Sequence, residues 1–112
     1  MEISCDTIKN VCGIYLIRNK INNKIYIGQS INIYRRWTEH LRSGQPKKYS
    51  IKSSRDSQTP IHLAMQKYGV DNFEISILEK CKKELLNEKE QYWIKILRSN
   101  NKDIGYNITS GG

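Results

Sequence analysis

The hydrophobic residues of this chain gather in three short runs and in three longer stretches with helical spacing. The short runs cover residues 12–18, 24–28 and 73–78. They are rich in β-branched and aromatic residues between polar borders, which predicts β-strands. A polar, turn-like break at 19–23 separates the first two runs, so these are expected to form a hairpin. A further short extended segment is predicted at 105–108.

The first helix is predicted over roughly 33–43, with Ser30 or Asn32 available as its N-terminal cap. Arg36 and His40 are four residues apart and therefore lie on the same side of this helix, beside its apolar stripe. That stripe is expected to be buried and consists of Ile33, Trp37 and Leu41.

The second helix is predicted to start at Thr59 and Pro60 and to stop at Gly69. A capping residue followed by proline favours a helix start, and glycine favours a helix end. A third, longer helix is expected over 83–98. The apolar face of the second helix consists of Ile61, Ala64, Met65 and Tyr68.

The predicted hairpin carries one tyrosine on each strand, Tyr15 and Tyr26. Because side chains alternate across a strand, each strand can offer its tyrosine to one face while aliphatic neighbours pack on the other. Taken alone, the two tyrosines fit packing on a sheet face as well as a place in a functional site.

One charged residue breaks the apolar stripe of the third helix. Leu86, Trp93 and Leu97 share one side of this helix, and Glu90 falls on the same side, four residues after Leu86. A carboxylate that faces a core is unfavourable unless it is paired or binds a metal ion. The pattern leaves both roles open for Glu90, whereas Glu88 is expected to be a surface acid.

The chain has 112 residues, 38% of them hydrophobic, which is typical of one globular domain with its own core. We therefore expect a single domain over 1–112. Within it, residues 1–10 are expected to form a flexible N-terminal arm. Residues 44–58, which are polar, basic and without period, are expected to form a mobile loop.

No apolar run approaches the roughly 20 residues that a membrane-spanning helix needs, and the N-terminus lacks the layout of a secretory signal. An intracellular protein without a membrane partner is the expectation. The three cysteines are irregularly spaced, which fits neither a disulfide framework nor a zinc site. Cys5, Cys12 and Cys81 are expected to be reduced, and the last two to be buried at the ends of strands.

The positive charge of the chain is unevenly distributed. The net charge is +8, and residues 1–56 hold eleven Lys and Arg against four Asp and Glu. The densest part, 35–55, has Glu39 as its only acid. Such a basic stripe is typical of a surface that binds a phosphate backbone, although a solvated surface has the same composition. The candidate DNA-binding residues are Arg35, Arg42, Lys47, Lys48, Lys52 and Arg55.

Gly13-Ile14-Tyr15, ten intervening residues and Tyr26-Ile27-Gly28 resemble the signature of the GIY-YIG nuclease superfamily. Further blocks follow in the family's order, so the resemblance runs from about residue 12 to residue 110. It is strongest to the catalytic domain of phage-type homing endonucleases. The further blocks are RW-x-x-H at 36–40, AM-x-KYG at 64–69, FEISILE at 73–79, EKEQYWI at 88–94 and GYNI at 105–108.

The resemblance implies an α+β fold in which a small three-stranded antiparallel sheet is flanked by three or more helices. It also implies hydrolysis of DNA phosphodiester bonds with one divalent metal ion, Mg²⁺ or Mn²⁺, in each active site. The catalytic residues that it implies are Tyr15, Tyr26, the phosphate-contacting Arg36, its neighbour His40, the metal ligand Glu90 and the supporting, hydrogen-bonding Asn107.

These residue types suit the implied chemistry. Phosphodiester hydrolysis needs a water molecule aimed in line, an acceptor for its proton, and positive charge on the phosphate. Arg36 can donate two hydrogen bonds to phosphate oxygens, and Glu90 with several waters suits Mg²⁺. Tyr15 is the expected general base, and His40 or bulk water then takes the proton. Because a phenol has a pKa of about 10, Arg36 and the metal ion would have to favour the phenolate.

Two features depart from the family. Some homing members have another histidine in the loop before the second helix, where this chain has Tyr49 and Asp56. His62 comes later and is therefore expected to be a helix-surface residue. Homing enzymes usually continue into a linker and a sequence-reading domain after the segment that contains Asn107, whereas this chain stops at Gly112. We expect an excised catalytic domain, or a protein that relies on a partner or on DNA shape, with weak intrinsic sequence specificity.

Two functions follow from this comparison. The first is a metal-dependent DNA endonuclease with a water nucleophile, a tyrosine base, an arginine clamp on the phosphate and one metal ion held by Glu90. The alternative is a non-catalytic or partner-dependent DNA-binding module of the same fold. Charge and fold alone do not separate DNA from RNA as the substrate.

Overall fold

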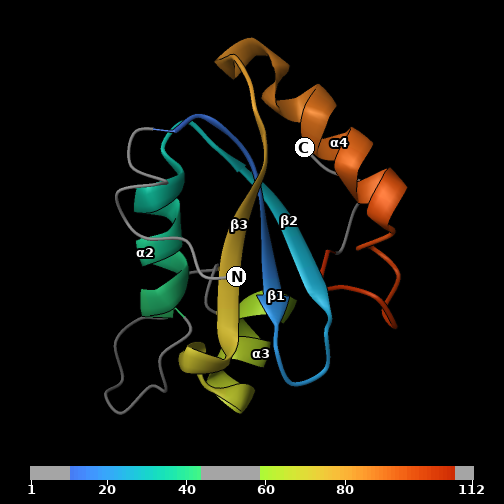
Figure 1. Cartoon of the computed structure of the whole chain (residues 1–112). Coiled ribbons are helices and arrows are strands. Elements are labelled where there is room, and N and C mark those ends of the chain that lie inside the picture. Colours follow the sequence, from blue (N-terminus) through green and yellow to red (C-terminus); the bar gives the residue numbers. More distant parts are fainter. Residues whose placement is uncertain (1–10, 44–58, 108–112) are drawn as a thin grey trace.

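The computed structural model describes residues 11–43 and 59–107 (Figure 1). The arm predicted at 1–10, the loop predicted at 44–58 and Ile108 lie outside the described residues. Three strands form one antiparallel sheet in the order β2-β1-β3, so the predicted sheet is confirmed. The strands are β1 (Gly13–Asn19), β2 (Ile25–Ser30) and β3 (Phe73–Lys80).

Asparagines make the turn of the β1–β2 hairpin. The Asn19 side chain accepts a hydrogen bond from the Ile21 backbone at 2.9 Å, and Asn22 accepts one from Lys24 at 2.9 Å. Asn23 adopts the left-handed conformation with φ of 64°, which asparagine tolerates better than most residues. The polar break in the sequence is therefore a tight turn, and the predicted hairpin is confirmed.

The three predicted helices are also present. The third prediction needs a correction at its start, because residues 83–85 form a single 3-10 turn before the α-helix begins. That helix ends where Arg98 takes a left-handed conformation with φ of 57°. The helical elements are α2 (Ile33–Ser43), α3 (Pro60–Tyr68), η2 (Val70–Asn72), η3 (Lys83–Leu85) and α4 (Leu86–Leu97).

The helix starts differ from one another in their capping. Of the two caps proposed for α2, Asn32 accepts a hydrogen bond from the backbone of Arg35 at 3.2 Å and is the cap. Thr59 precedes α3 as predicted, with Pro60 in the first turn, but its side chain makes no capping bond. Its hydroxyl instead lies 2.9 Å from the Nδ1 atom of His62.

The two faces of the sheet are buried by different helices. Tyr15 and Ile17 of β1 pack with residues of α2 and α3, whereas Ile14 of β1 and Ile27 of β2 pack with α4. In Figure 1, α2 and α4 accordingly lie on opposite sides of the sheet. Full burial of one such aliphatic side chain stabilises the fold by roughly 1.5–3 kcal/mol. The α+β architecture is confirmed, with the tyrosine faces of both hairpin strands turned toward α2 and α3.

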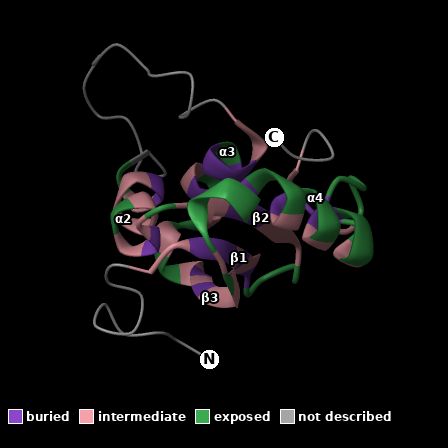
Figure 2. Ribbon diagram, turned by 90° about the horizontal axis from the view of Figure 1, so that it is seen from above, coloured by how far each residue is buried: buried purple, intermediate pink, exposed green. Residues whose placement is uncertain are grey.

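Some burial predictions are wrong in detail (Figure 2). On α2, Ile33 is fully buried as predicted, but Trp37 and Leu41 are only half-buried, and His40 is fully buried in their place. The helix is oriented so that the His40 imidazole faces the two tyrosines of the sheet. Trp93 and Leu97 of α4 are likewise half-buried, since the buried line of that helix is Leu86, Glu90 and Ile94. Cys12 and Cys81 are half-buried free thiols rather than buried ones, and Cys5 lies outside the described residues.

Candidate active site

Gly28 leaves the space that Tyr15 occupies. The two residues face each other across the β1–β2 ladder, so their side chains would point from the same face of the sheet. A Cβ atom on Gly28 would lie 2.3 Å from the Tyr15 Oη and 2.4 Å from its Cζ, well inside contact distance. The glycine that ends the Tyr26-Ile27-Gly28 block therefore allows the Tyr15 ring to lie over the neighbouring strand.

At Gly13, the backbone of β3 leaves no room for a side chain. A Cβ there would lie 2.1 Å from the backbone oxygen of Glu79. The register between β1 and β3 shifts at this place, between Ile14 and Tyr15. The first glycine of the signature thus allows two backbones to approach at a bulge directly before Tyr15.

Three rings meet where β1 and β2 face α2. Tyr15 is 1% exposed, and its Oη lies 2.7 Å from the His40 Nε2, within hydrogen-bond distance. The ring of Tyr26 is centred 5.6 Å from the imidazole and 6.5 Å from the Tyr15 ring. The structure thus brings both predicted tyrosines and the predicted histidine into one cluster.

His62 belongs to the same cluster, which contradicts its prediction as a surface residue. It is 1% exposed, and its Nε2 lies 2.6 Å from the His40 Nδ1. The two imidazole rings are centred 4.8 Å apart. On the far side of His62, Nδ1 lies 2.9 Å from the Thr59 Oγ1. An unbroken series of short polar contacts therefore runs from Tyr15 to the start of α3.

Arg36 lies one helical turn before His40 and is partly exposed. Its guanidinium donates a hydrogen bond to the Glu39 carboxylate at 3.3 Å, in an i,i+3 ion pair on the surface of α2. It is also close enough to Tyr15 and His40 to affect the pKa of each. Arg36 therefore lies beside Tyr15 and is partly exposed to solvent.

Burial controls the protonation of this cluster. It raises the pKa of Tyr15 far above the usual value for a phenol, and the Tyr26 neighbour adds to this, whereas Arg36 acts in the opposite direction. Burial lowers the pKa of His40 to about 2, with further contributions from the charge of Arg36 and from His62. The directions of these shifts favour a phenol at Tyr15 and a neutral imidazole at His40, and the lowering effect of Arg36 on the pKa of Tyr15 is smaller than the raising effect of burial.

Glu90 lies at the edge of β2, on the buried side of α4. Leu86 and Ile94, one turn before and one turn after it, are buried against Ile14 and Ile27 and hold the helix on the sheet. The Glu90 carboxylate is 9% exposed and accepts a hydrogen bond from the Gln29 amide at 3.3 Å. Its charge contributes to the raised pKa of Tyr15, which places it within electrostatic reach of the three-ring cluster.

The residues around Glu90 would suit a divalent ion that keeps most of its water ligands. Within 11–43 and 59–107 there is no group of three or more histidine, cysteine, aspartate or glutamate side chains that could enclose a metal. A lone carboxylate leaves most coordination positions to water and to phosphate oxygens. Mg²⁺ is commonly bound in this way, and zinc is not.

Asn107 contacts backbone rather than the rings. Its Oδ1 accepts a hydrogen bond from the Ile27 N–H at 2.9 Å, and its Nδ2 donates one to the Ile27 carbonyl at 2.9 Å. The side chain therefore pairs with β2 as a neighbouring strand would, directly between Tyr26 and Gly28. Among the described residues, the side-chain hydrogen bonds of Asn107 go to β2 and not to the side chains of the cluster.

Sequence reasoning missed Thr59, His62 and Gln29. Thr59 and His62 are three residues apart, a spacing that places a hydroxyl and an imidazole on the same side of a helix start. That spacing was available in the sequence. The contact between His62 and His40 was not, because residues 44–58 separate the two helices in the sequence.

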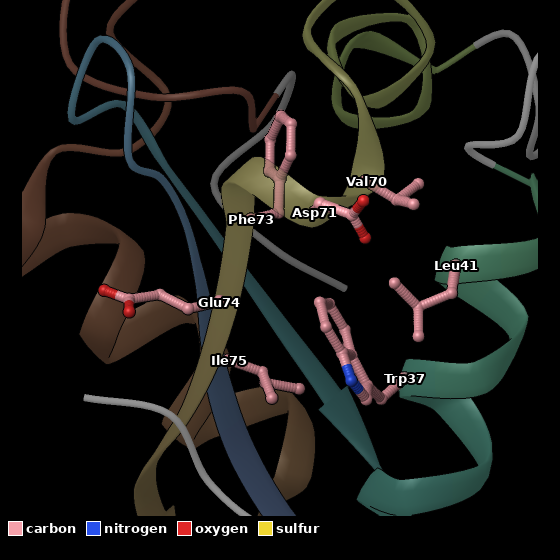
Figure 3. Close-up of a pocket in the computed structure, with 7 residues that line it drawn as sticks. All are labelled: Trp37, Leu41, Val70, Asp71, Phe73, Glu74 and Ile75. Atoms are coloured by element: carbon pink, nitrogen blue, oxygen red, sulfur yellow. The ribbon is translucent and has the colours of Figure 1, made fainter.

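Among the candidate DNA-binding residues, Arg35 and Arg42 lie on α2 and are exposed. Lys47, Lys48, Lys52 and Arg55 lie outside the described residues. A pocket of about 260 Å³ lies between α2 and the start of β3, lined by residues such as Trp37 and Phe73 (Figure 3). None of the predicted site residues lines it. Among the described residues, no helix is long and apolar enough to cross a membrane.

This chain is similar in sequence and in structure to known endonucleases. Intron-associated endonuclease 1 of Enterobacteria phage T4 is 37% identical over 98 residues, and the match covers 86% of this chain but only 36% of that protein. A mutant of the catalytic domain of intron endonuclease I-TevI matches with a TM-score of 0.71 and 33% identity, covering 91% of this chain and 97% of the other. A second structure, the catalytic domain of homing endonuclease I-TevI, matches with a TM-score of 0.63 and 36% identity, covering 88% and 98%.

Residues 11–103 match the family described as the GIY-YIG catalytic domain. The match contains both glycine–tyrosine blocks, α2 with Arg36 and His40, and α4 with Glu90. The resemblance inferred from the sequence is confirmed, and this chain belongs to the GIY-YIG family.

Proposed function

We propose that this chain is the catalytic domain of a DNA endonuclease that hydrolyses phosphodiester bonds with water as the nucleophile. The observation that carries the proposal is the cluster of Tyr15 and His40, joined at 2.7 Å, with Arg36 beside it and the Glu90 charge within reach. The names of the relatives, all endonucleases, support the same function. Products would carry 5′-phosphate and 3′-hydroxyl ends.

Tyr15 and His40 would handle the proton of the attacking water together. A buried phenol that resists ionisation cannot hold a negative charge in advance. Tyr15 would therefore accept the proton of water while it passes its own hydroxyl proton to the Nε2 of His40. The low pKa of His40 keeps its lone pair available for this transfer, but it also makes the imidazolium an unfavourable product.

Arg36 and Glu90 would act on the phosphate. The guanidinium of Arg36 can donate two parallel hydrogen bonds to non-bridging oxygens and neutralise charge that develops on them. Glu90 would hold one Mg²⁺ or Mn²⁺ in each active site. When bound, this ion supplies positive charge to the phosphate and to the leaving 3′ oxygen. Gln29 donates a hydrogen bond to the Glu90 carboxylate and would fix the orientation of that carboxylate.

The Glu90 assignment is tested with the isosteric variant Glu90→Gln. Supercoiled plasmid DNA is incubated with the wild-type chain and the variant in Mg²⁺, Mn²⁺ and EDTA, and nicked and linear forms are quantified. We expect metal-dependent nicking by the wild type and a loss of about 100-fold or more in the variant, because one charged group at the reacting phosphate contributes that much. DNA binding, measured by mobility shift, should persist.

Glu88→Gln is the matched control, since Glu88 lies two residues away on α4 and is exposed. It should nick like the wild type. Undiminished nicking by Glu90→Gln would contradict the metal-ligand role. A wild type that shifts DNA but never nicks it in either metal would favour the alternative, a non-catalytic or partner-dependent DNA-binding module. Duplex DNA, branched DNA and RNA are compared in the same assay.

Sequence recognition would come from elsewhere. The chain spans 36% of the length of the phage T4 endonuclease that it matches. We therefore propose that a separate sequence-reading domain or a partner protein directs the cut, and that the chain alone nicks with little sequence preference. Mapping of nick positions on a plasmid tests this, since a single strong site would contradict it.

A further inference from the structure

The buried histidines connect Tyr15 to the start of α3 through three consecutive short contacts. Tyr15 Oη and His40 Nε2 are 2.7 Å apart, His40 Nδ1 and His62 Nε2 2.6 Å, and His62 Nδ1 and Thr59 Oγ1 2.9 Å. Tyr15, His40 and His62 are each 0–1% exposed, whereas Thr59 is only partly buried. The chain of contacts thus runs from the centre of the site toward the solvent.

The two histidines must share one tautomer if all three contacts are hydrogen bonds. A neutral imidazole has one N–H donor and one acceptor nitrogen. If Tyr15 donates to His40 Nε2, then His40 Nδ1–H donates to His62 Nε2, and His62 Nδ1–H donates to the Thr59 oxygen. In the reverse order Thr59 donates to His62, His62 to His40, and His40 to Tyr15. The series of hydrogen bonds therefore has two consistent donor directions. A change of the hydroxyl at Thr59 alters the hydrogen bond at Tyr15 through the tautomers of the two histidines.

We propose that His62 and Thr59 are positioning residues that complete a proton relay from Tyr15 to solvent. This inference rests on the proposed function. It accounts for a feature that Tyr15 and His40 alone leave unexplained, namely that a deeply buried imidazole beside Arg36 is a poor place for a proton to remain. A second acceptor behind His40 lets the proton move on.

Each group in the relay receives one proton and releases one. The water proton goes to Tyr15 Oη, the Tyr15 proton to His40 Nε2, the Nδ1 proton of His40 to His62 Nε2, and the Nδ1 proton of His62 to Thr59, which releases its own to solvent. The hydroxide so formed makes the new bond to phosphorus, and the bond to the 3′ oxygen breaks, with that oxygen protonated by water. A proton that enters from solvent at Thr59 and leaves at Tyr15 restores both tautomers before the next turnover.

Substitutions at His62 and Thr59 can separate proton transfer from packing. Thr59→Val keeps the shape of threonine but removes its hydroxyl, and Thr59→Ser keeps the hydroxyl. His62→Gln keeps an atom that can bond to His40 Nδ1 but cannot pass a proton onward. We expect Thr59→Val and His62→Gln to lower kcat for plasmid nicking about 10-fold, a part of what general base catalysis contributes, with KM for DNA unchanged. Thr59→Ser should lie within about 2-fold of the wild type.

Two outcomes would overturn the relay. One is wild-type kcat in both Thr59→Val and His62→Gln. The other is an equal loss in Thr59→Val and Thr59→Ser, which would attribute the effect to the start of α3 rather than to the hydroxyl.

Nitrogen NMR separates failure of the relay from failure of the proposed function. The chain has only two histidines, so ¹⁵N-labelled histidine reports four ring nitrogens without substrate. We expect Thr59→Val to change the tautomer signals of both rings, and Thr59→Ser to leave them as in the wild type. Unchanged His40 signals in Thr59→Val would overturn the hydrogen-bonded chain whether or not the wild type nicks DNA. A wild type that does not nick, with coupled tautomers present, would overturn the proposed function and the catalytic use of the relay.

Discussion

Gly28 and Tyr15 show how a single missing side chain shapes this site. The Tyr15 ring extends from β1 over Gly28 of β2, and its hydroxyl lies 2.7 Å from His40. Any Cβ at position 28 would occupy the place of the phenol oxygen. The glycine is needed for the position of a residue on another strand, and not for a turn of its own backbone.

Gly28→Ala should therefore displace Tyr15 and abolish nicking. Forcing an extra carbon into a packed region costs roughly 1–3 kcal/mol of unfolding free energy. In a Tyr15→Ala background the ring is absent and the added methyl group has room, so the same substitution should cost at least about 1 kcal/mol less. Urea unfolding of the four proteins of this double-mutant cycle measures the difference. Equal costs in both backgrounds would show that Tyr15 is not what the methyl group meets.

The histidine at the centre of the cluster predicts a pH dependence of stability. The pKa of His40 is about 2 in the folded chain, because of burial first and then Arg36 and His62, and about 6.5 in the unfolded chain. Between these values the unfolded state binds the extra proton. The contribution to stability is thus complete above pH 6.5 and is lost as the pH falls toward 2, by up to about 1.4 kcal/mol per pH unit.

Urea unfolding between pH 7.5 and 5 tests this in a range above the titration of most carboxylates. The free energy of unfolding should fall with pH more steeply in the wild type than in His40→Gln. His62 lies 2.6 Å from His40, so the slope that is lost in the variant belongs to this pair of buried histidines. Parallel profiles would contradict the assignment of a neutral, buried His40.

At the scale of the elements, β2 is an edge strand whose outer side is covered by the segment after α4. Ile25 exchanges backbone hydrogen bonds with Ile104 and Tyr106 at 3.1 and 2.8 Å, and Asn107 continues the pairing to Ile27 with its side chain. This covering protects an edge that would otherwise expose unpaired backbone groups. It also holds β2 in place exactly where Tyr26 and Gly28 flank Ile27.

Asn107→Ala should loosen this edge. It removes two hydrogen bonds to backbone groups of Ile27, which we expect to cost roughly 1–3 kcal/mol of unfolding free energy. Amide hydrogen exchange at Ile27 should accelerate more than at residues of β3. Asn100→Ala is the control, because Asn100 is exposed in the same segment. Unchanged exchange at Ile27 would contradict the structural role of Asn107.

At the scale of the whole molecule, exposed positive charge and part of the candidate site lie on the same side of the sheet, on α2. The charge of +7 in residues 1–56 includes the exposed Arg35 and Arg42 of α2, the helix that also carries Arg36 and His40. The half of the chain that contains α4 is nearly neutral. We therefore expect the α2 side to face the DNA backbone.

Arg35→Ala should weaken DNA binding to all sequences alike. Each lost phosphate contact lowers the slope of log Kd against log salt concentration by about 0.9. Fluorescence anisotropy with a labelled duplex at several salt concentrations measures this slope. Lys95→Ala is the control, since Lys95 is exposed on α4. A larger effect at Lys95 than at Arg35 would place the DNA on the other side of the sheet.

The sequence by itself determined the elements of this protein and the family to which it belongs. The hairpin, the start of α3 at Thr59, its end at Gly69 and the buried position of Glu90 follow from periodicity and turn residues close together in the chain. Local patterns are sufficient here because strands and helices differ in the period of their apolar positions. The ordered blocks of the signature predict the site residues Tyr15, Tyr26, Arg36, His40, Glu90 and Asn107.

Only the tertiary structure decided which of these residues contact one another and how burial shifts their pKa values. His62 looked like a surface residue because its partner, His40, is 22 residues away. The raised pKa of Tyr15 and the lowered pKa of His40 come from burial, which no spacing of residues along the chain expresses. Asn107 pairs with Ile27 from 80 residues away. Contacts between distant segments and the exclusion of water are properties of the packed chain, and they bring two buried histidines behind Tyr15.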